Sequence, residues 1–198
     1  MSHGLTTPAD RLFGGAMIVA PLLLIASTVA YTISGGFNGN EIGGMVQIYA
    51  FTAWFLVVIG LERILQAPYP RAAVALTVLG ALGVAGGIAY GVDSMHVAEF
   101  GTSAEEIGWV GPLALNLPGI LFPIAHIGFG IALLRANVQP RWSGALLVVA
   151  AVLFPASRIP SVEALAVVAD GLFIVALAPL GWKIVQGRVS VSSSPTLT

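Results

Sequence analysis

Residues 72–92 read AAVALTVLGALGVAGGIAYGV and contain no charged side chain. An α-helix needs about 20 apolar residues to cross the hydrocarbon core of a bilayer, and this stretch has that length. Gly83, Gly87 and Gly91 recur every four residues within it, so they share one face of the helix. The stretch therefore predicts a transmembrane helix with a flat packing face, which we expect to be the central packing helix of a bundle.

Other apolar segments in the chain approach the same length. They are residues 12–33, 42–61, 110–134, 143–159 and 162–184. The segment 143–159 is the shortest, and only a few residues separate it from 162–184, which predicts a tight hairpin. We therefore expect an all-α polytopic membrane bundle of six transmembrane helices over residues 1–186, followed by a disordered cytoplasmic tail over residues 187–198.

The composition agrees with a protein whose outer surface faces lipid. Of the 198 residues, 57% are hydrophobic and 9% are charged, whereas a typical soluble domain is about a quarter charged. The basic residues form no dense block, which excludes a nucleic-acid-binding surface. The chain has no cysteine, so disulfides and thiolate metal sites are excluded as well.

The basic residues predict an orientation, because Lys and Arg beside transmembrane helices are retained on the cytoplasmic side. Seven of the eight fall at the ends that a six-helix topology places on one side: Arg11, Arg63, Arg71, Arg135, Arg141, Lys183 and Arg188. Six of the nine acidic residues fall on the other side. We therefore expect a multi-pass protein of the cell membrane with both termini in the cytoplasm.

A short run between two of the segments resembles a known kind of protein. The segment 110–134 ends in Leu133-Leu134-Arg135, and the next begins with Pro140-Arg141-Trp142-Ser143-Gly144. This run resembles small bacterial membrane proteins whose function is uncharacterised. The resemblance implies a location in a bacterial inner membrane, and it implies no activity.

Two ionisable residues, His126 and Asp170, lie inside predicted helices. Such groups are costly in lipid, usually face the bundle interior and are default candidates for a functional site. If their helices are neighbours, the two side chains could meet and act as a proton relay or as a catalytic acid and base. They could equally form a structural hydrogen bond between helices, and Asn116 could extend either network.

Arg158 and Trp54 are two further polar side chains that need a partner at their predicted positions. Arg158 is the one basic residue on the predicted outer side. It could bind an anionic ligand group or reach the lipid headgroups, but we expect it to pair with Glu163 across the hairpin. Trp54 falls in the middle of segment 42–61, where we expect it to pack with its indole N–H bonded to another group.

A weak metal-binding pattern follows the third predicted helix. Asp93, His96 and Glu99 recur every three residues, and all three are residue types that can ligate a divalent metal. The spacing matches no established metal motif, so we expect no metal there and no cofactor elsewhere.

Local signals predict two further features of the outer part of the bundle. Ser103 and Glu106 have the spacing of a capping box, which predicts a short surface helix over residues 104–109. Pro118 and Pro123 lie inside segment 110–134, and each removes a backbone hydrogen bond and tends to kink the helix.

Three functions remain open at this point. The first is a protein that binds or transports a small molecule, a cation or protons through a polar site near His126 and Asp170, with homo-oligomerisation as a possible requirement. The second is a membrane enzyme that acts on a lipid or isoprenoid-like substrate with the same two residues as acid and base. The third is a structural or accessory subunit that works by helix packing.

Overall fold

The computed structural model describes residues 7–34, 36–37, 39–138 and 140–188, and this part of the chain is all-helical, with no strand. The helices are α1 (Pro8–Ile33), α2 (Glu41–Leu65), α3 (Pro70–Phe100), α4 (Val110–Arg135), α5 (Arg141–Arg158) and α6 (Glu163–Val185), with a 3₁₀ turn η1 (Ala104–Glu106) before α4. Every predicted segment is therefore confirmed as a helix. The predicted tail at 187–198 lies outside the described residues, apart from Gly187 and Arg188.

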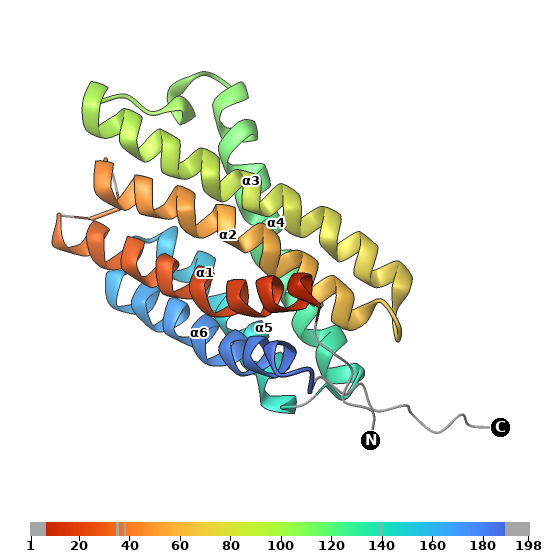
Figure 1. Cartoon of the computed structure of the whole chain (residues 1–198). Coiled ribbons are helices and arrows are strands. Elements are labelled where there is room, and N and C mark those ends of the chain that lie inside the picture. Colours follow the sequence, from red (N-terminus) through yellow and green to blue (C-terminus); the bar gives the residue numbers. More distant parts are fainter. Residues whose placement is uncertain (1–6, 35, 38, 139, 189–198) are drawn as a thin grey trace.

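The six helices form a closed ring (Figure 1). Each helix packs along the next one in sequence, and α6 returns to pack along α1. In this arrangement α3 lies between α2 and α4 as one member of the ring. The prediction that α3 is the central packing helix is therefore wrong, because the centre of the ring is filled by side chains from all sides.

Five helices in the described part of the chain, namely α1, α2, α3, α4 and α6, are long and apolar enough to cross a membrane. Their outer faces are also apolar: Val74, Val78 and Leu82 follow one another along α3, and all three are exposed. Exposed apolar residues at this density are typical of a surface in contact with lipid. Helix α5 is shorter, at 18 residues, and carries an arginine at each end.

The glycines of α3 allow close contacts with two different helices. A Cβ atom on Gly83 would lie 2.8 Å from the Cβ atom of Phe122 in α4, and one on Gly91 would lie 2.8 Å from the carbonyl oxygen of Gly44 in α2. Gly87 faces the ring of Phe51, also in α2. The predicted stripe is thus divided between two neighbours, since a helix in a closed ring needs a close-packing edge on each side.

Residues 101–109 form a turn that is fixed to the end of α3. The Oγ atom of Ser103 and the backbone N–H of Ala104 both donate to Asp93, each at 2.7 Å. Ser103 accepts from the N–H of Glu105 at 3.0 Å, and the helical part ends at Glu106. The predicted helix over 104–109 is therefore only a 3₁₀ turn, which ends before Gly108, where the backbone turns to a left-handed conformation with φ of 48°.

Candidate functional site

The first polar group in the interior of the ring is a pair formed by Trp54 and His126, both fully buried. Trp54 Nε1 donates to His126 Nε2 at 2.7 Å, which confirms that the indole N–H has a buried partner. Since Nε2 accepts, the imidazole proton lies on Nδ1, which donates to the carbonyl oxygen of Phe122 at 2.7 Å. Both nitrogens of His126 are thus already used by the protein.

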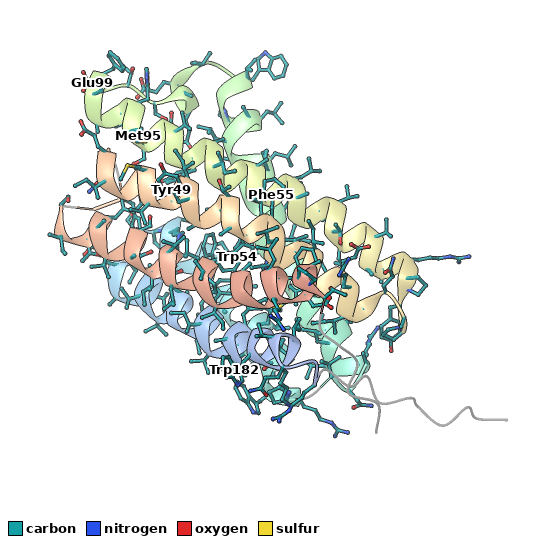
Figure 2. The ribbon with its side chains drawn as sticks, in the orientation of Figure 1. Tyr49, Trp54, Phe55, Met95, Glu99 and Trp182 are labelled. Atoms are coloured by element: carbon teal, nitrogen blue, oxygen red, sulfur yellow. The ribbon has the colours of Figure 1, made fainter. Side chains whose placement is uncertain are left out.

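Aromatic rings surround this pair on several sides. The ring centroids of Phe122, Phe129 and Phe173 lie 4.2, 6.2 and 5.8 Å from that of the His126 imidazole. Trp54 lies 5.2 Å from Phe173 in an edge-on arrangement, and Figure 2 shows Trp54 within the bundle. His126 is therefore a packed, neutral hydrogen-bonding residue of the core.

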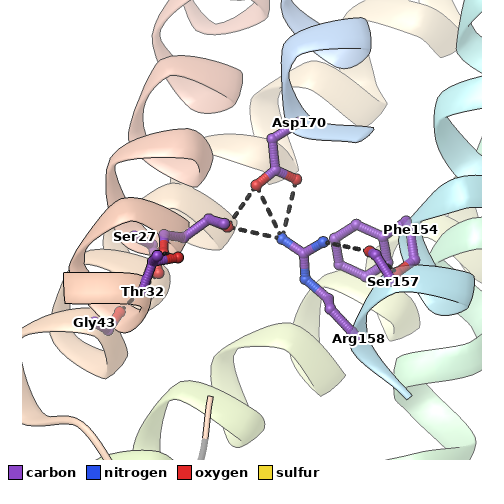
Figure 3. Close-up of polar contacts among 8 residues, drawn as sticks. Ser27, Thr32, Gly43, Phe154, Ser157, Arg158 and Asp170 are labelled. Carbon is purple, nitrogen blue, oxygen red and sulfur yellow. Dashed lines mark hydrogen bonds and ion pairs between the residues drawn. The ribbon is translucent and has the colours of Figure 1, made fainter. Parts of the chain in front are cut away.

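The second polar group is a buried ion pair between α5 and α6 (Figure 3). Arg158 Nη2 lies 3.0 Å from both carboxylate oxygens of Asp170 and also donates to the hydroxyl of Thr28 at 3.0 Å. Thr28 in turn donates to Asp170 Oδ2 at 2.5 Å. The Asp170 side chain is completely buried, while that of Arg158 remains 20% exposed. Three helices, α1, α5 and α6, are joined at this point.

The expected pairing of Arg158 with Glu163 is wrong, since the salt bridge found for Arg158 in the described residues is to Asp170. The physical reason is the depth of the two carboxylates. Asp170 is fully buried and needs a counterion, whereas Glu163 is only partly buried and can be hydrated.

His126 and Asp170 do not share a hydrogen bond in the described structure, because each is bonded to other partners. Their helices are not adjacent in the ring, although the His126 ring reaches Phe173 of α6 in the core. The ring neighbours of α4 are α3 and α5, whereas those of α6 are α5 and α1. The structure therefore provides two separate polar groups in place of one acid and base pair.

A cavity of about 610 Å³ lies between α2, α3, α4 and α5, beside the ion pair. Its apolar lining includes four aromatic side chains: Phe37, Phe51, Phe122 and Phe154. Its polar lining residues include Gln47, Tyr90, Glu105, Asn116 and Arg158. His126 and Asp170 are not among the lining residues, but Phe122 and Arg158, to which they are bonded, are.

Arg158 presents unused hydrogen-bonding capacity at this cavity. The hydrogen bonds from Arg158 to Asp170 and Thr28 all come from one nitrogen, Nη2. The other, Nη1, makes only a long 3.4 Å contact with Ser157. The guanidinium lies 3.9 Å from the centroid of the Phe154 ring, which supports its orientation. An arginine has five N–H donors, so several remain for a ligand or water.

Other groups in the cavity wall also lack protein partners. Within the described residues, the side chains of Asn116 and Tyr90 make no hydrogen bond, whereas Gln47 donates to the carbonyl of Gly87 at 2.9 Å. Pro123 has no N–H, so the carbonyl of Gly119 in the cavity wall has no intrahelical donor. The predicted polar residue Asn116 therefore lies in the cavity wall, which it shares with Arg158, and within the described residues its side chain is hydrogen-bonded to neither interior group.

The weak metal candidates are not assembled into a site. In the described ranges, no group of three His, Asp or Glu side chains is close enough to hold a metal ion. Asp93 is engaged by the turn at Ser103, and the ring of His96 packs 4.7 Å from that of Phe100.

Sequence reasoning missed several residues of the site. Thr28, Tyr90 and Phe154 acquire their roles only through neighbours that are distant in sequence. A hydroxyl in the middle of an apolar helix was the available signal for Thr28, but threonine can also bond its own helix backbone, so the signal is weak.

The fold and site define a class: an all-helical ring with five helices apolar enough to cross a membrane and a partly polar cavity between four of its helices. No protein-family model, curated protein or solved structure matches this chain.

Proposed function

We propose that this chain is a six-span protein of the cell membrane, with both termini in the cytoplasm, that binds a small molecule in the cavity beside Arg158. The observation that carries the proposal is the partly buried guanidinium of Arg158, which has unused donors in the wall of a cavity lined in part by four phenylalanines. Ligand sites are commonly concave, have volumes of about 300–1,000 Å³, and combine apolar walls with a few polar groups. The cavity has these properties.

The sixth span is supported by the position of α5 in the ring. Helix α5 packs along α4 and α6, and its residues Leu147, Ala150 and Ala151 are fully buried. Its outer face carries the exposed apolar residues Val149 and Val152, as the outer faces of the longer helices do, which suits contact with lipid. Its terminal arginines, Arg141 and Arg158, then lie near opposite ends of the bundle.

The orientation is supported by the separation of charge between the two ends. Figure 2 shows Glu99 and Trp182 toward opposite ends of the bundle. Arg63 and Asp10 form an exposed ion pair at 3.1 Å, which brings the start of α1 and the end of α2 to the same end. The positive-inside rule assigns this end to the cytoplasm.

In this proposal His126 and Asp170 support the cavity without contacting the ligand. Asp170 fixes Arg158, and His126 fixes the carbonyl of Phe122. A lipid-modifying enzyme would need an acid and a base in the cavity wall, and these two candidates do not line it. Binding, with or without transport, is therefore better supported than catalysis by this pair.

Photolabelling with benzophenone tests the proposal, because this neutral diaryl ketone carries an acceptor for Arg158 and inserts into nearby C–H bonds when irradiated. In nanodiscs, we expect peptide mass spectrometry to find labels on Phe51 and Phe122, which are both almost completely buried. Labels confined to lipid-facing positions such as Val168 and Val175 would contradict the proposal and favour an accessory subunit.

A matched pair of glycine substitutions provides the control. A Cβ atom would meet no other atom within 4 Å at either Gly119, which lines the cavity, or Gly15, which does not. We expect Gly119→Leu to reduce the cavity labels about tenfold, since the added side chain takes up space that the probe would occupy, and Gly15→Leu to leave them unchanged.

A further inference from the structure

Some of the α4 and α5 residues that line the cavity are also exposed at the outside of the molecule. Asn116 and Ile120 lie one turn apart on α4, and Ile120 is 51% exposed. Ile159, at the end of α5, is 81% exposed. A residue that both lines a cavity and is exposed outside marks its rim. The rim therefore runs along the gap between the first half of α4 and the C-terminal end of α5.

Helix packing explains why a gap forms there. Near the other end of the same interface, a Cβ atom on Gly130 of α4 would lie only 2.7 Å from the carbonyl oxygen of Gly144 in α5. Farther along, the rings of Phe122 and Phe154 separate the two helices, with centroids 5.0 Å apart. Two helices that touch by backbone at one end and are spaced by aromatic rings at the other must diverge.

Gly119 lies between Asn116 and Ile120 on α4 and adds to this opening. It lines the cavity, and a Cβ atom at this position would meet nothing within 4 Å. By contrast, Gly83 and Gly86 of α3 are in direct contact with α4. The absence of a side chain at Gly119 thus leaves open space, whereas the α3 glycines allow packing.

We infer that the gap between α4 and α5 admits the ligand sideways from the lipid, and that this ligand is an uncharged amphiphile whose acceptor group bonds to Arg158. The inference rests on the proposed binding function. The rim supports it, because Ile120 is apolar, is exposed on the outer surface of α4 and would face acyl chains in a membrane.

The charges around the cavity favour an uncharged ligand. Arg158 is already neutralised by Asp170, with both carboxylate oxygens 3.0 Å from Nη2. Glu105 in the cavity wall adds a negative charge. An anionic head would therefore meet a net negative site, whereas a carbonyl or hydroxyl oxygen can accept from the remaining N–H groups of Arg158 without that repulsion.

A phosphatidylcholine with benzophenone on one acyl chain tests the route, because its headgroup keeps the probe in the bilayer. In nanodiscs made with this lipid, we expect labels on Phe51 and Phe122, and about tenfold fewer in Gly119→Leu but not in Gly15→Leu. If free benzophenone labels both phenylalanines but the lipid-linked probe does not, ligand access from lipid is refuted and binding stands. If neither probe labels them, the proposed function itself fails.

The ligand class is tested by competition between 1-decanol and decanoate, which differ in the charge of the head. At equal bilayer concentrations and pH 8, we expect decanol to reduce free-benzophenone labelling of Phe122 at a concentration about tenfold lower than decanoate does. Equal competition, or stronger competition by decanoate, would overturn the assignment of an uncharged ligand.

Discussion

Arg158 and Asp170 lie on opposite sides of the hairpin between α5 and α6, and one guanidinium nitrogen is 3.0 Å from both oxygens of the carboxylate. Thr28 of α1 completes the group by bonding to both partners. Removing one partner of an ion pair in the interior is strongly destabilising, because the remaining charge is left without compensation. The pair therefore joins three helices and also fixes Arg158, a basic group of the cavity wall.

Replacing Asp170 by Asn should be strongly destabilising, because it leaves Arg158 without its counterion. We expect a loss of about 3 kcal/mol in the free energy of unfolding, measured by reversible unfolding in mixed micelles. The double variant Arg158→Met/Asp170→Leu should be more stable than Asp170→Asn alone, because it removes both charges. The exposed pair provides the control: Arg63→Gln should cost less than about 1 kcal/mol. Equal losses in Asp170→Asn and Arg63→Gln would contradict the buried ion pair.

Replacing His126 by Phe should leave the indole N–H of Trp54 without an acceptor in the core. We expect a loss of about 1–3 kcal/mol, the usual penalty for a buried unsatisfied donor. The double variant Trp54→Phe/His126→Phe should show a coupling energy, since the second change removes the unsatisfied group. Trp182→Phe, at an exposed position, serves as the control for loss of an indole. Strict additivity of the Trp54 and His126 changes would argue against their hydrogen bond.

Gly83 and Gly119 lie in the same part of the bundle, but their substitution by alanine should change the stability in opposite directions. At Gly83 the new methyl group would lie 2.8 Å from Phe122 Cβ and closer still to its backbone, so we expect a loss of about 1–3 kcal/mol. At Gly119 there is open space, and alanine favours the helix by about 0.5–1 kcal/mol. Thermal unfolding of the two variants in detergent measures the difference, and similar melting temperatures would show that the contact between α3 and α4 is looser than described.

The proposed six-span topology can be tested by cysteine labelling, because the chain contains no cysteine. Single cysteines at the exposed positions Thr102 and Ile159 should react with a membrane-impermeant maleimide in intact cells. Cysteines at Gln66 and Gln186, which are also exposed, should react only after permeabilisation. Protection of Ile159→Cys in intact cells, together with labelling of Thr102→Cys, would mean that α5 does not cross the membrane.

The positions of the helices could be predicted because they depend on local properties of the chain. An apolar run in lipid must satisfy its backbone hydrogen bonds within itself, so length and hydrophobicity are sufficient to predict a helix. The predicted segment 110–134, for example, differs from α4 (Val110–Arg135) by one residue at its end. His126 and Asp170 could likewise be recognised as buried polar residues, because ionisable groups in apolar segments avoid lipid.

The partners of those residues could not be predicted, because they depend on which helices are neighbours. The sequence alone determined six apolar helices and the polar residues that must face inward, since both follow from the cost of exposing polar groups to hydrocarbon. Only the tertiary structure decided that α5 lies between α4 and α6, so that Asp170 pairs with Arg158 while His126 bonds to Trp54. The physical reason is that helix association in lipid depends on the fit of side chains and glycines between helices distant in sequence.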